Sequence, residues 1–414
     1  MSLPLLEKGH ASGLANAHNY PWIAVVLATL MQAAEAWTAT GVFTLYPFIQ
    51  PELNLSQTQV GFITAAFMAS GVFTAFPGGW LTDFWGVRRL VIICLAGAVL
   101  PSLGFSLMNS LWMGVVLALL VGTATGPIFP ATSRAVMEWL PQKRRGLGMG
   151  IKQVGPPLSS GVAALLFPAI AVATSWRISV LAVGGFVAFV AILTVAFYRD
   201  KPSSGIKAPR VNAKELLGMA RDRALMVPAL WATIFVGIQF AVISYFILFL
   251  VNQVGLSKVG AGSYLTIIMA VSIVGRVAWG AISDTLLGGR RLMVLGILGA
   301  STVFVLIALA FVDEGVSTVF LVAVAVGVGL TVVAWMGIYT VLIGELAGVR
   351  RSGSAIGGAQ VFMRAGMTAF PPAFGYMADA SGSYALGWLV MAGLGSVATL
   401  GLLVFGKEQP RATT

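Results

Sequence analysis

Twelve long apolar stretches divide the sequence, and they constrain its fold more than any single motif. They lie near residues 21–49, 57–81, 89–109, 112–139, 146–172, 177–198, 227–252, 258–284, 291–312, 317–346, 352–378 and 384–406. A hydrocarbon core about 30 Å thick needs about 20 helical residues, whereas membrane β-strands are short and alternate in polarity. Because 58% of the 414 residues are hydrophobic and 9% are charged, we expect an all-α membrane protein with twelve transmembrane helices.

The positive charges predict how this protein lies in the membrane. A net charge of +11 can indicate a nucleic-acid partner, but here the lysines and arginines concentrate in alternate loops. The loops on one side carry Lys8, Arg88, Arg89, Lys143, Arg144, Arg145, Arg199, Lys201, Lys207, Arg210, Lys214, Arg221, Arg223, Arg290, Arg291, Arg350, Arg351, Lys407 and Arg411. The opposite loops carry Arg177 and Lys258. The positive-inside rule therefore predicts a multi-pass plasma-membrane protein, a bacterial inner-membrane protein with cytoplasmic termini, whose partner is lipid rather than nucleic acid.

Few residues could support metal, redox or enzymatic chemistry. Cys94 is the single cysteine and lies within an apolar stretch, while His10 and His18 both precede the first stretch. A thiolate metal cluster or an intrachain disulfide needs more cysteines. No nucleophile and base occur in a recognisable arrangement, so we expect neither a cofactor nor an enzyme, and we expect a monomer.

The polar interval 199–226 divides the stretches into six plus six. The predicted organisation is a tail at 1–20, a six-helix bundle at 21–198, a cytoplasmic linker at 199–226, a second bundle at 227–406 and a tail at 407–414. Asn212 and Glu215 have the spacing of a capping box, so the linker could hold a short surface helix or be a simple tether.

The two halves repeat one another. Asp83 and Asp284 lie 201 residues apart, and the same offset relates Gly79 to Gly280 and Met68 to Met269. An offset of 207 aligns Arg144, Gly146, Gly150, Gln153 and Val154 with Arg351, Gly353, Gly357, Gln360 and Val361. Repeated six-helix units are typical of secondary transporters, which bind substrate between the halves near the membrane midplane.

The segment Gly79-x-Leu81-x-Asp83-x-x-Gly86-x-Arg88-Arg89 resembles the loop signature of the major facilitator superfamily, and the likeness extends over essentially the whole chain. In that family the loop acid and basic residues join the cytoplasmic ends of the bundles in the outward-facing state. The resemblance implies this cytoplasmic gate for Asp83, Arg88 and Arg89, with a weaker counterpart at Asp284 and Arg290. Phe84 departs from the family pattern, which often has a basic residue there.

Charged residues inside the apolar stretches are the candidates for substrate chemistry, because an unneeded charge costs a few kcal/mol in a membrane. At 1.5 Å per residue, Arg276 lies about 12 Å from Asp284 along its helix, Arg364 about 18 Å into helix eleven and Glu35 about 21 Å into helix one. Arg134 and Lys152 lie about 9 Å inside their helix ends, where they could line a cavity or extend to the surface.

Arg276 is the charge that the repeat does not explain, since the offset of 201 places Ala75 opposite it. The run Gly275-Arg276-x-x-Trp279-Gly280-x-x-Ser283-Asp284 resembles helix eight of carboxylate carriers such as the oxalate/formate antiporter family, in which this arginine binds the substrate carboxylate. A second cation of helix eleven corresponds there to a position near Ala359 or Gln360, and Arg364 lies about one turn further. A structural role for Arg276, paired with an acid or a carbonyl, is the alternative.

These charges favour a small organic anion, a monocarboxylate or dicarboxylate, carried by alternating access. Arg134, Lys152, Arg276 and Arg364 outnumber the intramembrane acid Glu35, and a guanidinium can bind a carboxylate with two hydrogen bonds. Glu35, oriented by Gln32, is the candidate for proton coupling, because burial disfavours its charged form. A permanent salt bridge is its alternative, and anion exchange is the alternative to symport. Gln360, Tyr339, Trp335, Gln239 and Trp37 could complete the pocket or simply pack.

Helix five favours another function. The segment Gly150-Ile151-Lys152-Gln153-Val154-Gly155-Pro156-Pro157-x-x-x-Gly161 partly resembles the glycine-proline motif of proton-coupled drug exporters, but it lacks the paired glycines after the proline. Small residues also let helices approach closely. Two alternatives therefore remain, a proton-coupled exporter of drugs or metabolites and a non-transporting membrane sensor with the same fold.

Overall fold

The computed structural model describes residues 19–201, 222–347 and 352–406, and these residues form two bundles of helices. The tails, His10, His18 and most of the expected linker, with Asn212 and Glu215, lie outside the described residues. Helices of the N-terminal half are α2 (Tyr20–Thr44), α3 (Tyr46–Glu52), α4 (Gln57–Gly104), η1 (Phe105–Leu107), α5 (Leu111–Thr125), α6 (Ile128–Trp139), η2 (Gln142–Arg144), α7 (Arg145–Ala173) and α8 (Trp176–Phe197). Those of the C-terminal half are α10 (Arg223–Asn252), α11 (Lys258–Thr285), α12 (Arg291–Ala310), α13 (Thr318–Val328), η3 (Gly329–Val333), α14 (Met336–Ala347), α15 (Ser352–Ser381) and α16 (Ala385–Phe405).

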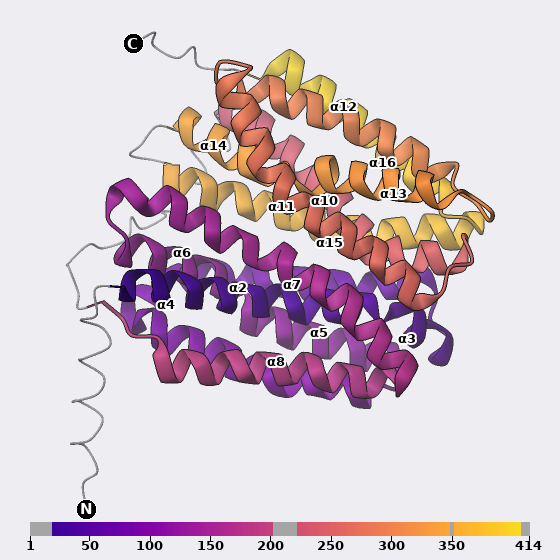
Figure 1. Ribbon diagram of the computed structural model, residues 1–414, viewed down its shortest axis with the longest axis horizontal. Coiled ribbons are helices and arrows are strands. Elements are labelled where there is room, and N and C mark those ends of the chain that lie inside the picture. Colours follow the sequence, from indigo (N-terminus) through magenta and orange to yellow (C-terminus); the bar gives the residue numbers. More distant parts are fainter. Residues whose placement is uncertain (1–18, 202–221, 348–351, 407–414) are drawn as a thin grey trace, which may run out of the picture.

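The halves lie side by side with their helices roughly parallel (Figure 1). Contacts between them run along two seams, where α7 packs against α11 and α4 packs against α15. The start of α2 and the end of α16 lie at the same end of the molecule, on the left of Figure 1. We call this end the terminal face and the opposite end the distal face.

The expected all-α membrane fold is confirmed. In the described part of the chain, ten helices are long and apolar enough to cross a membrane. The remaining two expected spans correspond to the first part of α4 and to α15. Side chains with exposed apolar surface, such as Phe304, Val397 and Leu400, lie on these helices as they would against lipid.

Several spans are interrupted where hydropathy alone indicates one continuous helix. The first span breaks at Leu45, because Pro47 cannot donate a backbone hydrogen bond to the preceding turn. The fourth breaks between α5 and α6 at Gly126 and Pro127 for the same reason. In the tenth, η3 is a π-helical segment, and the Leu330 carbonyl there accepts a 2.8 Å hydrogen bond from Trp279 Nε1 of α11.

The segment expected as a loop between the second and third spans holds a sharp turn at Gly86, where the two helices that make up α4 meet. Gly86 has φ 79° and ψ 165°, a backbone conformation that glycine adopts and other residues avoid. Asp200, just past α8, lies where a Cβ at this position would be, and its carboxylate accepts a 3.0 Å hydrogen bond from the Arg88 backbone N–H. The signature glycine therefore lets the end of the sixth span dock against the start of the third.

Candidate functional site

The contacts between the two halves differ between the terminal face and the distal face. Among the described residues, hydrogen bonds between the halves cluster toward the distal face. Asp379 at the end of α15 accepts from the backbone N–H groups of Gln57 and Thr58 at 2.8 Å each, and from Thr58 Oγ1 at 2.5 Å. Tyr245 Oη donates to the Gln57 carbonyl at 2.6 Å. The distal ends of α4, α10 and α15 are thus held together.

Close backbone contacts reinforce this closure. A Cβ at Gly61 would lie 2.5 Å from Pro372 Cα, so α4 and α15 touch almost directly. On the other seam, Thr266 Oγ1 of α11 donates to the Gly161 carbonyl of α7 at 2.8 Å. The glycines at these positions permit the halves to meet on the distal side.

Among the expected gate residues on the terminal face, Arg88 has a described side-chain contact, and this contact stays within one half. Arg88 donates through Nη2 to the Val195 carbonyl at 2.7 Å, inside the N-terminal half. Arg89 is exposed. The side chain of Asp83 lies outside the part of the chain that the structure describes. The gate assigned to these residues therefore stays a prediction for another conformation.

The expected counterpart gate residues, Asp284 and Arg290, differ in their surroundings, and their gate role stays a prediction. The ion pair described for Asp284 is with Arg291 Nη2, at 2.6 Å. Arg290 precedes the first residue of α12 and its side chain is exposed, whereas Arg291 begins the helix and turns inward, also donating to Ser283 Oγ at 2.7 Å. Both bonds stay within the C-terminal half.

The acid and two of the expected intramembrane cations form one electrostatic group between the halves. Glu35 on α2 experiences the charges of Arg364 on α15 and Lys152 on α7. Arg364 packs over Gly71 of α4, where a Cβ would collide with its guanidinium. Helix eleven therefore brings a positive charge against the N-terminal half, where it acts on Glu35.

Lys152 is fully enclosed, at 0% exposure, and is satisfied by neighbours from the fourth span. Its Nζ donates to Ser133 Oγ at 2.6 Å and to Thr132 Oγ1 at 3.4 Å, and it lies 4.3 Å from the centroid of the Phe129 ring. Ser133 and Thr132 are functional candidates that the sequence analysis missed. Their spacing from Lys152 gives no signal, because the contact depends on how two helices pack.

Arg276 does not pair with an acid among the described residues. Its Nη1 donates to the backbone carbonyl of Gln153 on α7, at 3.0 Å, and its Nε is buried without a hydrogen-bond partner. The side chain of Gln153 accepts a 3.1 Å bond from Gln32 Nε2, and Gln32 Oε1 is buried and unpartnered. Gln153 thus links Arg276 to α2, one turn from Glu35.

The expected aromatic residues lie in two separate places. Trp335 is enclosed at 0% exposure, packs edge-on to Tyr339 with ring centroids 5.6 Å apart, and donates to Gln239 Oε1 at 3.1 Å. Tyr339 Oη is buried without a partner. Trp37 instead packs in the core of the N-terminal half, 4.9 Å from the ring centroid of Phe167.

The remaining predicted residues are placed apart or contribute no described side-chain bond. Arg134 pairs with Glu138 on the next turn of α6 at 2.5 Å, so its described ion pair is local. Gln360 is half-buried on α15. Among the described residues, no group of three or more histidine, cysteine, aspartate or glutamate side chains could hold a metal ion.

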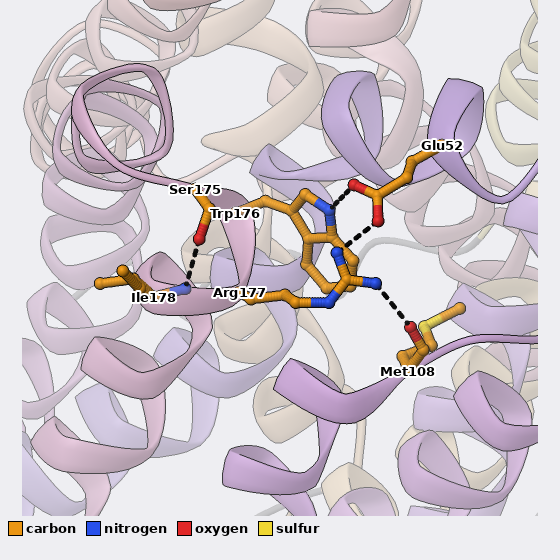
Figure 2. Close-up of polar contacts among 6 residues, drawn as sticks. All are labelled: Glu52, Met108, Ser175, Trp176, Arg177 and Ile178. Atoms are coloured by element: carbon orange, nitrogen blue, oxygen red, sulfur yellow. Dashed lines mark hydrogen bonds and ion pairs between the residues drawn. The ribbon is translucent and has the colours of Figure 1, made fainter.

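A second polar cluster supports the distal face of the N-terminal half (Figure 2). The Glu52 carboxylate, at the end of α3, accepts a 2.5 Å hydrogen bond from Trp176 Nε1 and forms an ion pair with Arg177. Arg177 Nη2 also donates to the Met108 carbonyl at 3.4 Å. The hydrogen bond from Trp176, which has the larger effect, and the one from Arg177 hold the pKa of Glu52 below its usual range. The cluster ties together three distal loops of one half.

Comparisons with known proteins agree with this fold. The family model described as Major Facilitator Superfamily matches residues 22–357. The chain is 26% identical over 384 residues to a hexuronate transporter of Bacillus subtilis (strain 168), covering 87% of this chain and 88% of the relative. It is 24% identical over 384 residues to a probable sulfoacetate transporter of Cupriavidus necator, covering 86% and 87%.

A solved structure is similar in fold. It is a bacterial homolog of the human lysosomal transporter Spinster in an inward-facing and occupied conformation, with a TM-score of 0.79 and 15% identity, covering 94% of this chain and 97% of that one.

Proposed function

Because the chain belongs to the Major Facilitator Superfamily, we propose that it is a secondary transporter that carries a small organic anion with a carboxylate between its two halves. The observation that carries the proposal is Arg276. A guanidinium is held inside the protein by a neutral carbonyl, and its Nε has no partner, so a charge and a donor remain for an anion. The relatives named for hexuronate and sulfoacetate transport support this substrate class.

The surrounding charge favours the same class. Lys152, Arg276 and Arg364 outnumber Glu35, and a surplus of positive charge away from water is costly unless an anion neutralises it. A carboxylate can take two parallel hydrogen bonds from a guanidinium, which gives direction as well as attraction. We therefore place the substrate carboxylate at Arg276, with Gln360 and Tyr339 as candidate neighbours.

Glu35 is the proposed site of proton coupling. Two cations that belong to different halves, Lys152 on α7 and Arg364 on α15, both act on its charge. Loading a proton on Glu35 would release these cations to an anion, and losing the proton would return them to Glu35. Symport of anion and proton follows from this competition.

The proposed orientation places the terminal face in the cytoplasm. Exposed cations such as Arg89, Lys143 and Arg144 lie there, whereas Arg177 and Lys258 lie at the distal ends. With this orientation the distal closure by Asp379 describes an inward-facing conformation. Alternating access would then require the distal contacts to open.

Counterflow in proteoliposomes tests the substrate class. Purified protein is loaded with D-glucuronate or sulfoacetate, and uptake of the labelled compound is measured. We expect uptake by the unaltered protein, loss of at least about 90% in Arg276→Ala, and normal uptake in Arg223→Ala, which removes an exposed arginine at the start of α10. Normal counterflow in Arg276→Ala would refute the proposed anion site.

The coupling is tested separately with Glu35→Gln. This variant should retain counterflow, which needs no net proton movement, and should lose accumulation driven by an imposed pH gradient. If it still accumulates substrate against a gradient, Glu35 is not the coupling group.

A further inference from the structure

Two prolines lie inside α7 without ending it. Pro156 and Pro157 fall within the continuous helix Arg145–Ala173. A helical proline has no N–H to donate to the carbonyl four residues earlier, so that carbonyl loses its intrahelical bond. The two carbonyls released in this way are those of Lys152 and Gln153.

The carbonyl of Gln153 is the one that Arg276 uses. Arg276 Nη1, on the other half of the protein, donates to it at 3.0 Å. A buried carbonyl without a donor is energetically unfavourable, so a released acceptor next to a cation is strongly favoured to pair with it. Pro157 thus leaves without an intrahelical donor the same backbone oxygen that Arg276 contacts.

We propose that the Gln153 carbonyl, released by Pro157, is a positioning group that orients Arg276 for the substrate carboxylate. Holding the guanidinium by Nη1 leaves its Nε buried and without a hydrogen-bond partner, available to a carboxylate. An arginine side chain has about 2 kcal/mol of rotamer entropy to lose, and a side chain that is already fixed loses less of it when the anion binds. This inference rests on the anion-binding function proposed above.

Gln153 contacts both parts of the site, the one around Glu35 and the one around Arg276. The Gln153 side chain accepts from Gln32, one turn before Glu35, while its backbone holds Arg276. Because Gln153 and Arg276 belong to different halves, the orientation of the guanidinium depends on the packing of α7 against α11. The Thr266 bond to the Gly161 carbonyl maintains that seam closer to the distal face.

Binding of D-glucuronate and of sulfoacetate to the purified full-length protein provides the test, by calorimetry and by thermal shift. Pro157→Ala restores an N–H that competes for the Gln153 carbonyl, and we expect Kd to rise about tenfold. Pro156→Ala is the matched control, since it restores a donor to the Lys152 carbonyl one residue away, and should change Kd by less than about twofold. If Pro157→Ala does not fold, Pro157→Ser serves, because serine supplies the same N–H.

A cycle with Arg276→Lys separates positioning from a general structural effect. Lysine keeps the charge but has no planar fork to orient, so adding Pro157→Ala to Arg276→Lys should leave Kd unchanged. The inference is overturned if Pro157→Ala binds as well as the unaltered protein, or if it weakens binding equally in both backgrounds. If Arg276→Lys alone leaves Kd unchanged, or neither probe binds, the proposed function itself fails and the inference fails with it.

Discussion

Asp379 offers a direct test of what holds the distal face closed. The carboxylate accepts three hydrogen bonds from the first residues of α4, across the boundary between the halves. Losing an N-terminal helix cap costs about 1 kcal/mol, and the negative charge adds a few tenths at an exposed helix end. Because the partners separate when the distal face opens, the whole cost of Asp379→Asn falls on the closed state. A change of about 1 kcal/mol shifts the closed-to-open ratio about fivefold.

Cysteine accessibility can measure this shift. Met269 is buried in the seam between α7 and α11, with 2% of its surface exposed. In a Cys94→Ala, Met269→Cys background, a membrane-impermeant maleimide applied from the distal side should label about five times faster when Asp379→Asn is added. Asp313→Asn, an exposed acid of the α12–α13 loop, is the charge-matched control and should not change the rate. Equal rates in all three proteins, or the same acceleration in the control, would refute the reasoning.

The pH dependence of the closure has a defined sign. Partial burial acts to raise the pKa of Asp379, but the hydrogen bonds from Thr58 and Gln57 outweigh it and the pKa is lowered. A lowered pKa means that the stabilisation is present above the ordinary aspartate value, about 3.9, and is lost as the pH falls through the pKa of the closed state. The ratio of the labelling rate with Asp379→Asn to the rate without it should therefore be constant from about pH 8 to pH 5, and should fall toward one only below about pH 4, where the unaltered protein also loses the stabilisation.

Three further predictions follow from single side chains. Glu52→Gln should lower Tm by about 1–3 °C at neutral pH, as expected for an exposed pair, and its difference from the unaltered protein should vanish below about pH 4, because the pKa of Glu52 is lowered. Gly86→Ala should destabilise the protein by about 2 kcal/mol through its backbone conformation, and Asp200→Ala should rescue only part of the lost Tm, since it removes the collision and not the backbone strain. Tyr339→Phe should raise Tm without ligand, because it removes a buried unpartnered hydroxyl, and should weaken D-glucuronate binding in calorimetry if that hydroxyl contacts the anion.

Hydropathy and the internal repeat were sufficient to predict the helices and the two halves, because membrane insertion requires long apolar runs regardless of tertiary detail. The interruptions needed local chemistry, and Pro47 and Pro127 were available signals for two of them. The local pair of Arg134 with Glu138 could also have been inferred from its i,i+4 spacing. Asp379 could not, since its partners lie more than 300 positions away in the sequence and only the packed halves bring them together.

The main-chain role of Gln153 shows a different limit of sequence reasoning. The Gly155-Pro156-Pro157 segment was interpreted through its resemblance to exporters and through close helix packing. The backbone acceptors of this segment are more informative. Each helical proline leaves the carbonyl four residues earlier without its intrahelical donor, so that carbonyl must find another one. The sequence analysis gave a structural pairing of Arg276, with an acid or a carbonyl, as the alternative to substrate binding, and the structure shows a carbonyl as its described partner.

That distinction bears on how readily an anion can bind. If Arg276 were paired with a buried carboxylate, a substrate would have to displace that acid and leave it uncompensated, at a cost of several kcal/mol. A carbonyl partner leaves the positive charge of the guanidinium unneutralised, so an incoming carboxylate gains a charge-assisted bond without breaking an ion pair. Glu35 is the acid that does compete for positive charge, and its competition concerns Arg364 and Lys152. The proposed site thus separates Arg276, which would recognise the anion, from Arg364 and Lys152, whose charge a proton on Glu35 would release, and we expect Arg276→Ala and Glu35→Gln to alter binding and coupling independently.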